Sequence, residues 1–204
     1  QKKKYRIEDF ALKEIWQDNI KYDDFKKLNN FFWFFSLDLK SSKKTTQTVV
    51  NNWINKNNRY NKKSWNFDIT SKRIISWLSN HQLTYEDSDK EYKIKFDQCI
   101  QKQANHLLSE MRNSNNFENK IIGCAAIILT GLAYQNNKNY LSNGLNILKK
   151  IIKSSIDNQG FPNSRNIKQL SFYLKYFIVI REWFKESQNT VPEYIDETIY
   201  YLGL

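Results

Sequence analysis

The sequence predicts an all-α fold, and three of its features indicate this. Only two prolines and five glycines occur among 204 residues, so few positions are of the kind that breaks helices. Residues compatible with helices, chiefly Lys, Leu, Ile, Gln and Glu, are frequent, and no segment alternates apolar and polar residues convincingly. About nine helical segments are joined by short polar links, and helices linked in this way pair antiparallel. We therefore expect antiparallel helical hairpins in a single helical domain over residues 1–204.

Two helices are predicted before residue 40. Residues 7–16 place apolar side chains on one helical stripe, and residues 24–39 form a second helix. The second helix contains five consecutive aromatic residues, at positions 31–35. Five in a row cannot all face one core. They are either covered by neighbouring helices on several sides, or some of them line a groove.

Two further helices follow a polar break. Thr45 or Thr46 is the predicted N-cap of the third helix, which ends near residue 57. Thr70 is the predicted N-cap of the fourth helix, in which Arg73 and Trp77 follow at helical spacing.

The second half of the chain is predicted to hold longer helices. Residues 92–111 form one, and residues 120–134 form another whose small side chains, among them Gly131, permit the close approach of a neighbouring helix. Residues 140–156 form an amphipathic helix, and the last helix, at residues 193–202, follows a capping-box pattern.

A turn precedes the most apolar helix of the chain. Gly160 and Pro162 force this turn, and the helix cannot start before the proline is passed. Asn163 or Ser164 then caps the helix, which leaves Arg165 in its first turn. That position lies at the positive end of the helix dipole and normally favours acids. Arg165 is therefore either solvated or faces an anion.

Composition narrows the classes of function. The net charge of +11 predicts attraction to polyanions, whether nucleic acid, acidic polysaccharide or an anionic membrane surface. No apolar run approaches the roughly 20 residues that cross a bilayer. Cys99 and Cys124 are too few for a metal cluster or a disulfide framework, and we interpret both as small buried hydrophobes. His81 and His106 lack the spacing of a helical metal pair, so no metal or cofactor is expected.

Four side chains are candidates for binding or chemistry, each with a structural alternative. Trp65 lies in a polar loop with several cations, where it provides a platform for a sugar ring or fills the core. Arg73 and Trp77 either line a groove or belong to the core. His106 either transfers protons or lies on a solvated helix face.

Several segments, in this order, are similar to one family: FFWFFSLDL, WINKNNRYNKKSWNFDITSKRIISWL, QKQANHLL, IILTGLAY, YLSNGLNILKKIIKSSIDNQGFPNSRN and VPEYIDETI. Over residues 25–203 the chain resembles the N-terminal helical domain of the bacterial heparinase II/III-like proteins, particularly those of alphaproteobacteria. The closest segments are T-x-x-R-I-x-x-W-L and the glycine turn that ends in S-R-N.

The resemblance implies an incomplete α/α toroid, in which helical hairpins form a ring around a groove. In whole proteins of the family a β-sandwich domain follows and shares the active site, and nothing like it occurs up to Leu204. The sequence begins with glutamine and shows no export signal, so we expect an interior piece of a longer bacterial protein of the periplasm or cytoplasm.

The resemblance also implies a chemistry. Characterised members are lyases that cleave uronic-acid polymers by β-elimination. A base removes the proton at carbon 5, a cation or donor stabilises the carboxylate, and an acid protonates the leaving oxygen. Active members use Asn or Arg for the carboxylate and Tyr or His for the proton transfers. On this basis the catalytic candidates are Arg165, Asn166 and His106, and the substrate-binding candidates are Arg73, Trp65, Trp77 and Tyr173. Arg165 and Asn166 have a structural alternative as scaffold of the helix start, and Tyr173 has one as a core residue.

The sequence departs from the family pattern at two places. The family has an Asn-His pair ahead of the small-residue helix, where this chain has Glu, Asn and Lys at residues 118–120. The Asn-His pair that ends at His106 lies one helix earlier. At the glycine turn Phe161 occupies the expected histidine position, and no tyrosine follows before Tyr173.

These observations leave three hypotheses. In the first, this is the helical domain of a polysaccharide lyase that binds an acidic, uronate-containing polysaccharide in a basic groove, with a C-terminal β domain completing the active site. In the second, it is a non-catalytic relative that binds glycan or serves in envelope assembly, because the catalytic set is incomplete. The third, nucleic-acid binding, rests on charge alone, and no helix-turn-helix or aromatic RNA-binding signature supports it.

Overall fold

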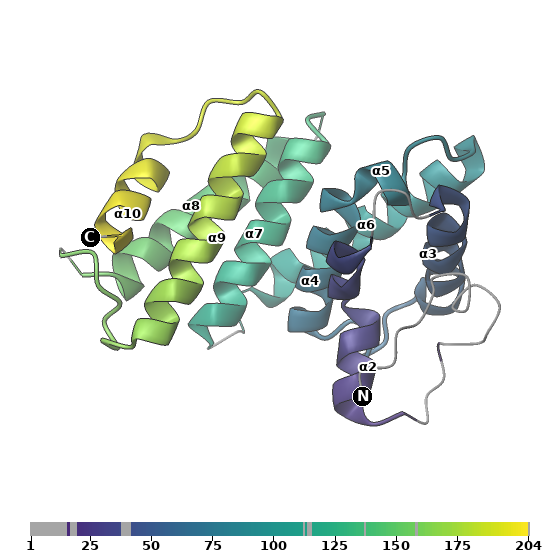
Figure 1. Ribbon diagram of the computed structural model, residues 1–204, viewed down its shortest axis with the longest axis horizontal. Coiled ribbons are helices and arrows are strands. Elements are labelled where there is room, and N and C mark those ends of the chain that lie inside the picture. Colours follow the sequence, from purple (N-terminus) through teal and green to yellow (C-terminus); the bar gives the residue numbers. More distant parts are fainter. Residues whose placement is uncertain are drawn as a thin grey trace. The chain divides into compact units, whose positions relative to one another are not determined.

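The computed structural model is helical throughout the part of the chain that it describes (Figure 1). The described residues are 16, 20–37, 42–111, 113, 116–136, 138–157 and 159–203. Within them there are nine α-helices and one 3-10 helix, and no strand beyond an isolated bridge between Ile156 and Pro162. The predicted all-α class is confirmed. The helix predicted at residues 7–16 lies, apart from Trp16, outside the described residues.

The chain divides into two compact units, residues 1–103 and residues 104–204. The N-terminal unit holds α2 (Tyr22–Asn29), η1 (Phe32–Ser36), α3 (Lys43–Asn57), α4 (Phe67–Ser79), α5 (His81–Thr84) and most of α6 (Lys90–Glu110). The C-terminal unit holds the end of α6, α7 (Phe117–Ala133), α8 (Lys138–Ser155), α9 (Ile167–Glu186) and α10 (Glu193–Gly203). None of the described helices combines the length and the apolar character that a membrane crossing needs.

Aromatic side chains form the core of the N-terminal unit. Phe31 adopts a left-handed conformation (φ 58°) that separates α2 from η1, so the predicted helix there is two elements. A 3-10 helix has three residues per turn, which brings Phe31 and Phe34 to the same side, and both are fully buried. The ring of Phe31 lies edge-on to those of Trp53 and Trp77, with centroids 6.2 and 5.1 Å away. Phe35 is half exposed, so the aromatic run is only partly core.

Two helices of this unit begin earlier than predicted. The hydroxyl of Ser42 accepts a hydrogen bond from the backbone N–H of Thr45 (3.2 Å), so Ser42 caps α3. The side chain of Asn66 accepts from the backbone N–H of Asp68 (3.2 Å) and caps α4, which places Thr70 inside that helix. The predicted N-caps are therefore wrong. Serine and asparagine cap as well as threonine does, and the packed face of each helix selects among the candidates.

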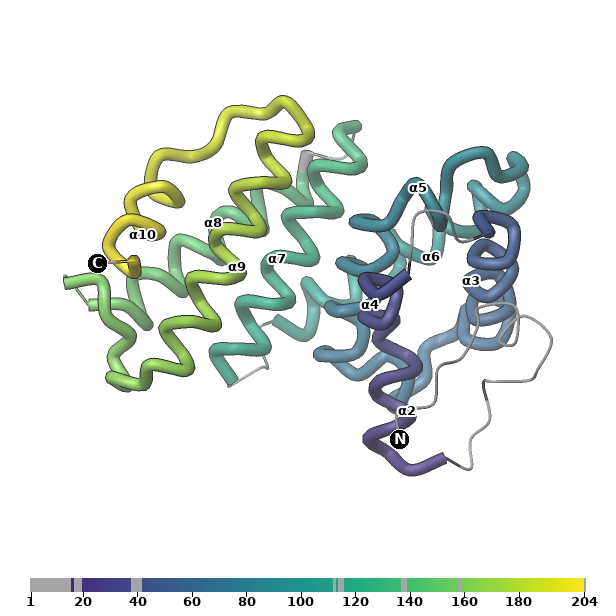
Figure 2. Tube along the Cα trace, viewed as in Figure 1, coloured from purple at the N-terminus to yellow at the C-terminus, as the bar shows by residue number. Residues whose placement is uncertain are grey.

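In the C-terminal unit α7 packs against both α8 and α9 (Figures 1 and 2). A Cβ atom on Gly131 of α7 would lie 2.4 Å from the backbone nitrogen of Leu141 in α8. A Cβ atom on Gly144 of α8 would lie 2.7 Å from a side-chain carbon of Ile128. The small residues therefore allow the two helices to approach closely, which confirms the prediction for the α7 helix. The α10 helix packs against α9.

Both cysteines are buried and free, as predicted. Burial raises the pKa of the Cys99 thiol to about 11 and raises the pKa of Cys124 as well. The Cys124 thiol donates a hydrogen bond to the backbone oxygen of Gly144 (2.9 Å). Both therefore serve packing, because a protonated buried thiol is a poor nucleophile.

Candidate functional site

The predicted site residues are divided between the two units. Arg73, Trp65 and Trp77 lie in the N-terminal unit, and His106, Arg165, Asn166 and Tyr173 lie in the C-terminal unit. Arg165 and Asn166 are exposed and adjacent, His106 is half-buried, and the other four are buried.

Arg73 is a core residue. Its side chain is fully buried, and its guanidinium carbon lies 3.9 Å from the centroid of the Trp53 ring. It donates hydrogen bonds of 2.7–3.2 Å to four oxygen atoms, those of Gln103, Asn29, Ser64 and Thr70. Burial lowers the pKa of Arg73 to about 9, so the side chain remains a cation at neutral pH. The buried charge is thus satisfied by hydrogen bonds to uncharged oxygen atoms, and these bonds connect separate segments of the N-terminal unit.

Three aromatic candidates are also buried. Trp77 is fully buried, Trp65 is 5% exposed and Tyr173 is 1% exposed. The indole N–H of Trp65 donates to the backbone oxygen of Asn57 (2.9 Å), which anchors the ring below its loop. Burial raises the pKa of Tyr173. None of the three presents a ring face to solvent on which a sugar could stack.

His106 lies half-buried on α6. Its backbone oxygen accepts a hydrogen bond from the Ser109 hydroxyl (2.7 Å). The preceding Asn105 accepts a hydrogen bond from the hydroxyl of Tyr140 (2.9 Å), which joins α6 to α8. The Asn-His pair thus contributes an asparagine that links two helices.

The turn before α9 is closed by Asp157. One carboxylate oxygen of Asp157 accepts hydrogen bonds from the backbone N–H groups of Gln159 and Phe161, both at 2.9 Å. Its own N–H donates to the backbone oxygen of Phe161 (2.8 Å). Gly160 takes a φ of +83°, which a residue with a side chain rarely adopts. The predicted glycine turn is therefore a closed, hydrogen-bonded loop.

Asn166 caps α9. Its side-chain oxygen accepts from the backbone N–H of Lys168 (2.9 Å), and the helix begins at the next residue, Ile167. The prediction that Asn163 or Ser164 caps the helix is wrong. Asn163 instead donates from its side chain to the backbone oxygen of Ser154 (2.9 Å) and ties the turn to the end of α8. Asn163 is therefore engaged in a contact with α8, and Asn166 caps the helix in its place.

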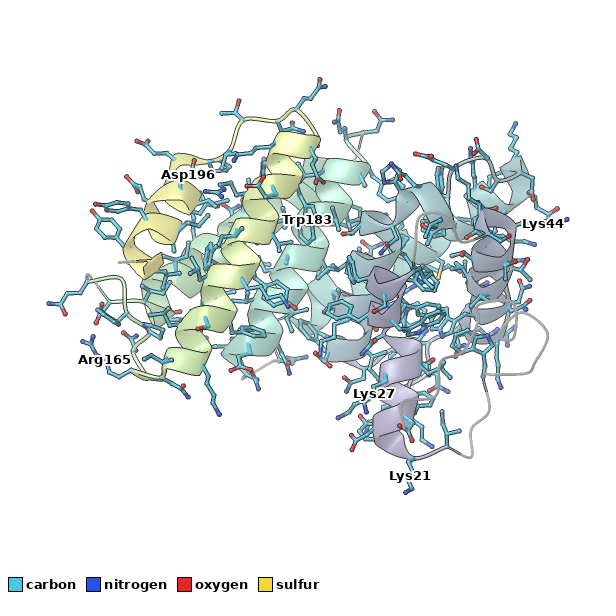
Figure 3. All side chains as sticks on the ribbon, in the orientation of Figure 1. Lys21, Lys27, Lys44, Arg165, Trp183 and Asp196 are labelled. Carbon is cyan, nitrogen blue, oxygen red and sulfur yellow. The ribbon has the colours of Figure 1, made fainter. Side chains whose placement is uncertain are left out.

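Arg165 lies before the helix and not in its first turn. It adopts a φ of +53°, and its guanidinium is 2.7 Å from the second carboxylate oxygen of Asp157. The guanidinium carbon is 5.4 Å from the centroid of the Phe161 ring, and the side chain is 61% exposed at the edge of the molecule (Figure 3). The Phe161 N–H, and to a lesser extent Arg165, lower the pKa of the Asp157 carboxyl. Arg165 is thus held in place while it faces solvent.

One exposed aromatic ring, that of Phe161, lies beside this arginine, and two more exposed rings lie at the end of α10. A Cβ atom on Gly160 would lie 2.6 Å from the Cβ and the backbone oxygen of Tyr201, so the end of α10 packs directly on the turn. The exposed fractions are 43% for Phe161, 63% for Tyr200 and 51% for Tyr201. We call these three residues and Arg165 the Arg165 surface. Tyr200 and Tyr201 were not among the predicted site residues, although two consecutive residues of an amphipathic helix cannot both face its core.

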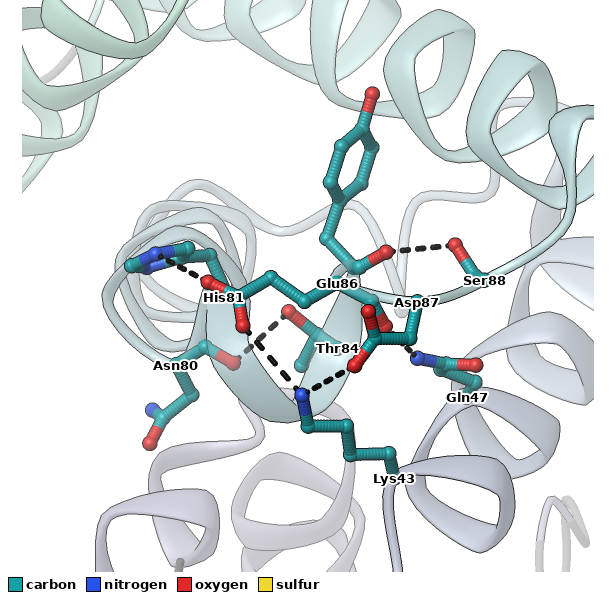
Figure 4. Close-up of polar contacts among 9 residues, drawn as sticks. Lys43, Gln47, Asn80, His81, Thr84, Glu86, Asp87 and Ser88 are labelled. Atoms are coloured by element: carbon teal, nitrogen blue, oxygen red, sulfur yellow. Dashed lines mark hydrogen bonds and ion pairs between the residues drawn. The ribbon is translucent and has the colours of Figure 1, made fainter.

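A second polar cluster joins α3 to the turn after α5 (Figure 4). The Lys43 ammonium is 2.6 Å from Asp87 and 3.4 Å from Glu86, and the side chain of Gln47 donates to the backbone oxygen of Glu86 (2.7 Å). His81 lies 3.1 Å from the other Glu86 oxygen. Every charged group here has a partner within the cluster, which gives it the character of a structural clamp.

Among the residues that the structure describes, no three His, Cys, Asp or Glu side chains are arranged to hold a metal ion. Comparisons of the chain with protein-family models, with curated proteins and with solved structures find no significant match.

Proposed function

We propose that this chain is the helical, toroid-forming part of a heparinase II/III-like protein and that it binds an acidic, uronate-containing polysaccharide at the Arg165 surface. The observation that carries the proposal is an exposed arginine, fixed by Asp157 beside the exposed ring of Phe161. The exposed rings of Tyr200 and Tyr201 lie at the end of α10, which packs on Gly160 of the same turn. The order of sequence motifs that resembles the family supports the same ligand class.

The chemistry of the Arg165 surface suits a sugar acid. A guanidinium has five N–H donors in a fixed plane, so its contact with Asp157 leaves donors for a second carboxylate. The ring of Phe161 beside it offers a flat apolar face for the C–H face of a sugar ring. Because Asp157 and Phe161 already orient Arg165, little side-chain entropy is lost on binding.

Exposed lysines add to the attraction for a polyanion. Lys153 lies in the last turn of α8, next to Ser154, to which the turn is hydrogen-bonded. Lys168 lies in the first turn of α9, directly after the cap. Both lysines are exposed, so they provide two further cations on the helices that this turn connects.

Bond cleavage by β-elimination would require groups that this chain does not supply at the Arg165 surface. A base and an acid must reach carbon 5 and the leaving oxygen, and the candidate Tyr173 is buried. The proposal therefore assigns binding to this chain and the proton transfers to a further domain of the complete protein. The burial of Tyr173 also favours the alternative, a non-catalytic glycan-binding role.

Binding is tested with the polyuronate alginate and with heparin, with neutral dextran as the control polymer. Arg165→Gln and Tyr200→Ala should each weaken binding of the acidic polymers about twofold to fivefold, because exposed contacts of this kind contribute about 0.5–1 kcal/mol. Lys175→Gln on the exposed part of α9 removes the same charge as Arg165→Gln and should leave affinity nearly unchanged. No binding of any acidic polymer, or an equal loss with Lys175→Gln, would contradict the proposal.

Turnover separates the enzymatic from the non-catalytic form of the proposal. The complete protein is incubated with the same polymers, and formation of unsaturated products is followed by their near-ultraviolet absorbance. Product that disappears with Arg165→Ala would support the lyase and exclude the non-catalytic role. Tight binding without product across the panel would support the non-catalytic role.

A further inference from the structure

The loop between α3 and α4 presents cations and an aromatic ring to solvent. Arg59, Lys62 and Lys63 are exposed, and Tyr60 is 64% exposed, more than any other described tyrosine. Tyr60 lies edge-on to the buried Trp65, with ring centroids 6.2 Å apart. The aromatic residue that faces solvent in this loop is therefore Tyr60, whereas the sequence pointed to Trp65.

This loop is rigidly held at its base. The side chain of Asn61 accepts hydrogen bonds from the backbone N–H groups of Lys63 (2.9 Å) and Ser64 (3.3 Å). The backbone oxygen of Asn61 accepts from the N–H of Trp65 (2.8 Å). The buried Arg73 donates to the backbone oxygen of Ser64 (3.0 Å), so the same cation that orders the core also fixes the loop. A ligand would meet exposed side chains on an ordered backbone.

The charge around the loop has one sign. Lys102 of α6 donates to the side chain of Asn58 (2.9 Å) and adds a fourth cation at the start of the loop. No acidic residue occurs in the sequence from residue 39 to residue 67. Among the described residues, no ion pair engages Arg59, Lys62, Lys63 or Lys102. Cations concentrated in this way attract a polyanion.

We infer that the loop, with Arg59, Tyr60, Lys62, Lys63 and Lys102, is a separate binding site for an acidic polysaccharide, in which Tyr60 stacks on a sugar ring and the cations contact carboxylate or sulfate groups. The assignment of the ligand class rests on the proposed function, but the residues are distinct from the Arg165 surface. Two sites in one chain would give a long polymer a higher affinity than a short one.

Two features favour polysaccharide over nucleic acid as the partner. Single-stranded nucleic acid is bound by several aromatic side chains on which successive bases stack, and this loop offers one exposed ring. Duplex recognition needs a helix or ribbon that enters a groove, and a short turn between two helices provides neither. One ring with surrounding cations matches one sugar ring with its acidic substituents.

The test compares two variants of the full chain that remove equal charge from exposed positions of the N-terminal unit. The loop variant is Arg59→Gln/Lys62→Gln/Lys63→Gln, and the control is Lys21→Gln/Lys44→Gln/Lys90→Gln. Kd values are measured for heparin, for alginate and for single-stranded DNA of matched charge. We expect the loop variant to bind the acidic polysaccharides about tenfold more weakly and the control less than twofold more weakly. Tyr60→Ala should weaken binding severalfold, and Tyr60→Phe should not.

The outcomes separate the two assignments. A polymer that binds the wild-type chain and is released by Arg165→Gln but not by the loop variant would overturn the loop site and leave the Arg165 surface standing. Equal losses for the loop variant and its control would overturn the loop site in the same way. DNA that binds more tightly than the polysaccharides and depends on the loop would identify nucleic acid as its partner and overturn the inference. The circular dichroism spectrum and midpoint of unfolding, unchanged by these exposed substitutions, confirm that each variant is folded.

Discussion

At the scale of single residues, the two arginines singled out by sequence have opposite environments. Arg73 is fully buried and bonded to four neutral oxygens, whereas Arg165 is 61% exposed and held by one carboxylate. Removing one partner from a buried, hydrogen-bonded cation leaves the other partner unpaired. This lowers the free energy of unfolding far more than losing an exposed contact does. We therefore propose that Arg73 serves stability and Arg165 serves binding, and their substitutions should separate these effects.

Arg73→Met should destabilise the N-terminal unit by about 3–5 kcal/mol, because it leaves the backbone oxygens of Asn29 and Ser64 and the side chain of Gln103 without their donor. The measurement is chemical unfolding followed by tryptophan fluorescence. The control, Arg59→Met, replaces an exposed arginine and should change stability by less than about 0.5 kcal/mol. Equal unfolding midpoints for the two variants would show that Arg73 does not hold the core.

Asn166→Ala should destabilise α9 by about 1 kcal/mol through loss of its cap. Asn166→Asp keeps a capping oxygen and should retain stability, yet it should weaken binding of acidic polymers because it adds a negative charge beside Arg165. Asn143→Ala, at an exposed position of α8, is the control for both unfolding and affinity. A stable Asn166→Ala variant would argue against the cap.

At the scale of elements, the helices are placed by local features that act between neighbours. Gly131 lets α7 and α8 approach, the clamp of Lys43 joins α3 to the turn after α5, and the end of α10 rests on Gly160. Each contact joins segments through one or two residues. Single substitutions should therefore affect one pair of elements at a time.

Gly131→Ala should destabilise the C-terminal unit by about 1–3 kcal/mol, because the new Cβ meets the backbone of Leu141, which cannot move without shifting α8. The matched control is Gly203→Ala, where a new Cβ meets nothing within 4 Å and stability should stay the same or rise slightly. Thermal unfolding measured by circular dichroism compares the two. If both variants melt alike, the close approach of α7 and α8 is not needed.

The clamp of Lys43 should make stability depend on pH at both extremes. The hydrogen bond from Lys43 lowers the pKa of Asp87 below its ordinary value of 3.8. The ion pair therefore stabilises the fold fully above pH 3.8, and this stabilisation is lost as the pH falls through the lowered pKa. The hydrogen bond to Asp87 raises the pKa of Lys43 above its ordinary value of 10.5. The stabilisation by the ion pair is therefore complete below pH 10.5 and is lost as the pH rises through the raised pKa.

Lys43→Gln should therefore lower the melting temperature at about neutral pH, and the difference from wild type should shrink toward both extremes. The neighbouring exposed lysine provides the control, Lys44→Gln, which should melt like wild type over the whole range. A constant difference between Lys43→Gln and wild type at all pH values would rule out the ion pair as its cause.

At the scale of the whole molecule, charge is distributed unequally over the chain. Residues 1–103 contain 21 Lys and Arg against 13 Asp and Glu, and residues 104–204 contain 11 against 8. The excess of cations is therefore larger in the N-terminal unit, which carries the basic loop. Long-range attraction of a polyanion should act mainly on that unit.

Binding of acidic polysaccharide should weaken steeply with salt, because each contacted acidic group releases a bound counterion. Between about 50 and 200 mM salt we expect at least a tenfold loss of affinity, with a smaller slope for the Arg59→Gln/Lys62→Gln/Lys63→Gln variant than for Arg165→Gln. The measurement is the Kd for heparin over a series of salt concentrations. Affinity that is independent of salt would contradict binding through exposed cations.

The sequence by itself determined the all-α class, the burial of both cysteines and the close approach at Gly131. These follow from spacing along the chain, because helical periodicity and side-chain size act over a few residues. Tertiary structure decided which candidates reach solvent. Arg73 is buried because its acceptors come from residues as distant as Asn29 and Gln103, and no local pattern contains that information.

Contacts between distant residues also decide which side chain caps a helix and which aromatic ring faces solvent. Trp65 and Tyr60 stand five residues apart in one polar loop, and the structure turns the first inward and the second outward because Asn57 accepts the indole N–H. Asn163 and Asn166 are equivalent as local caps, and contacts with Ser154 assign the first to the turn. Local sequence thus proposes the residue types for a site, whereas contacts between distant segments choose which of them face solvent.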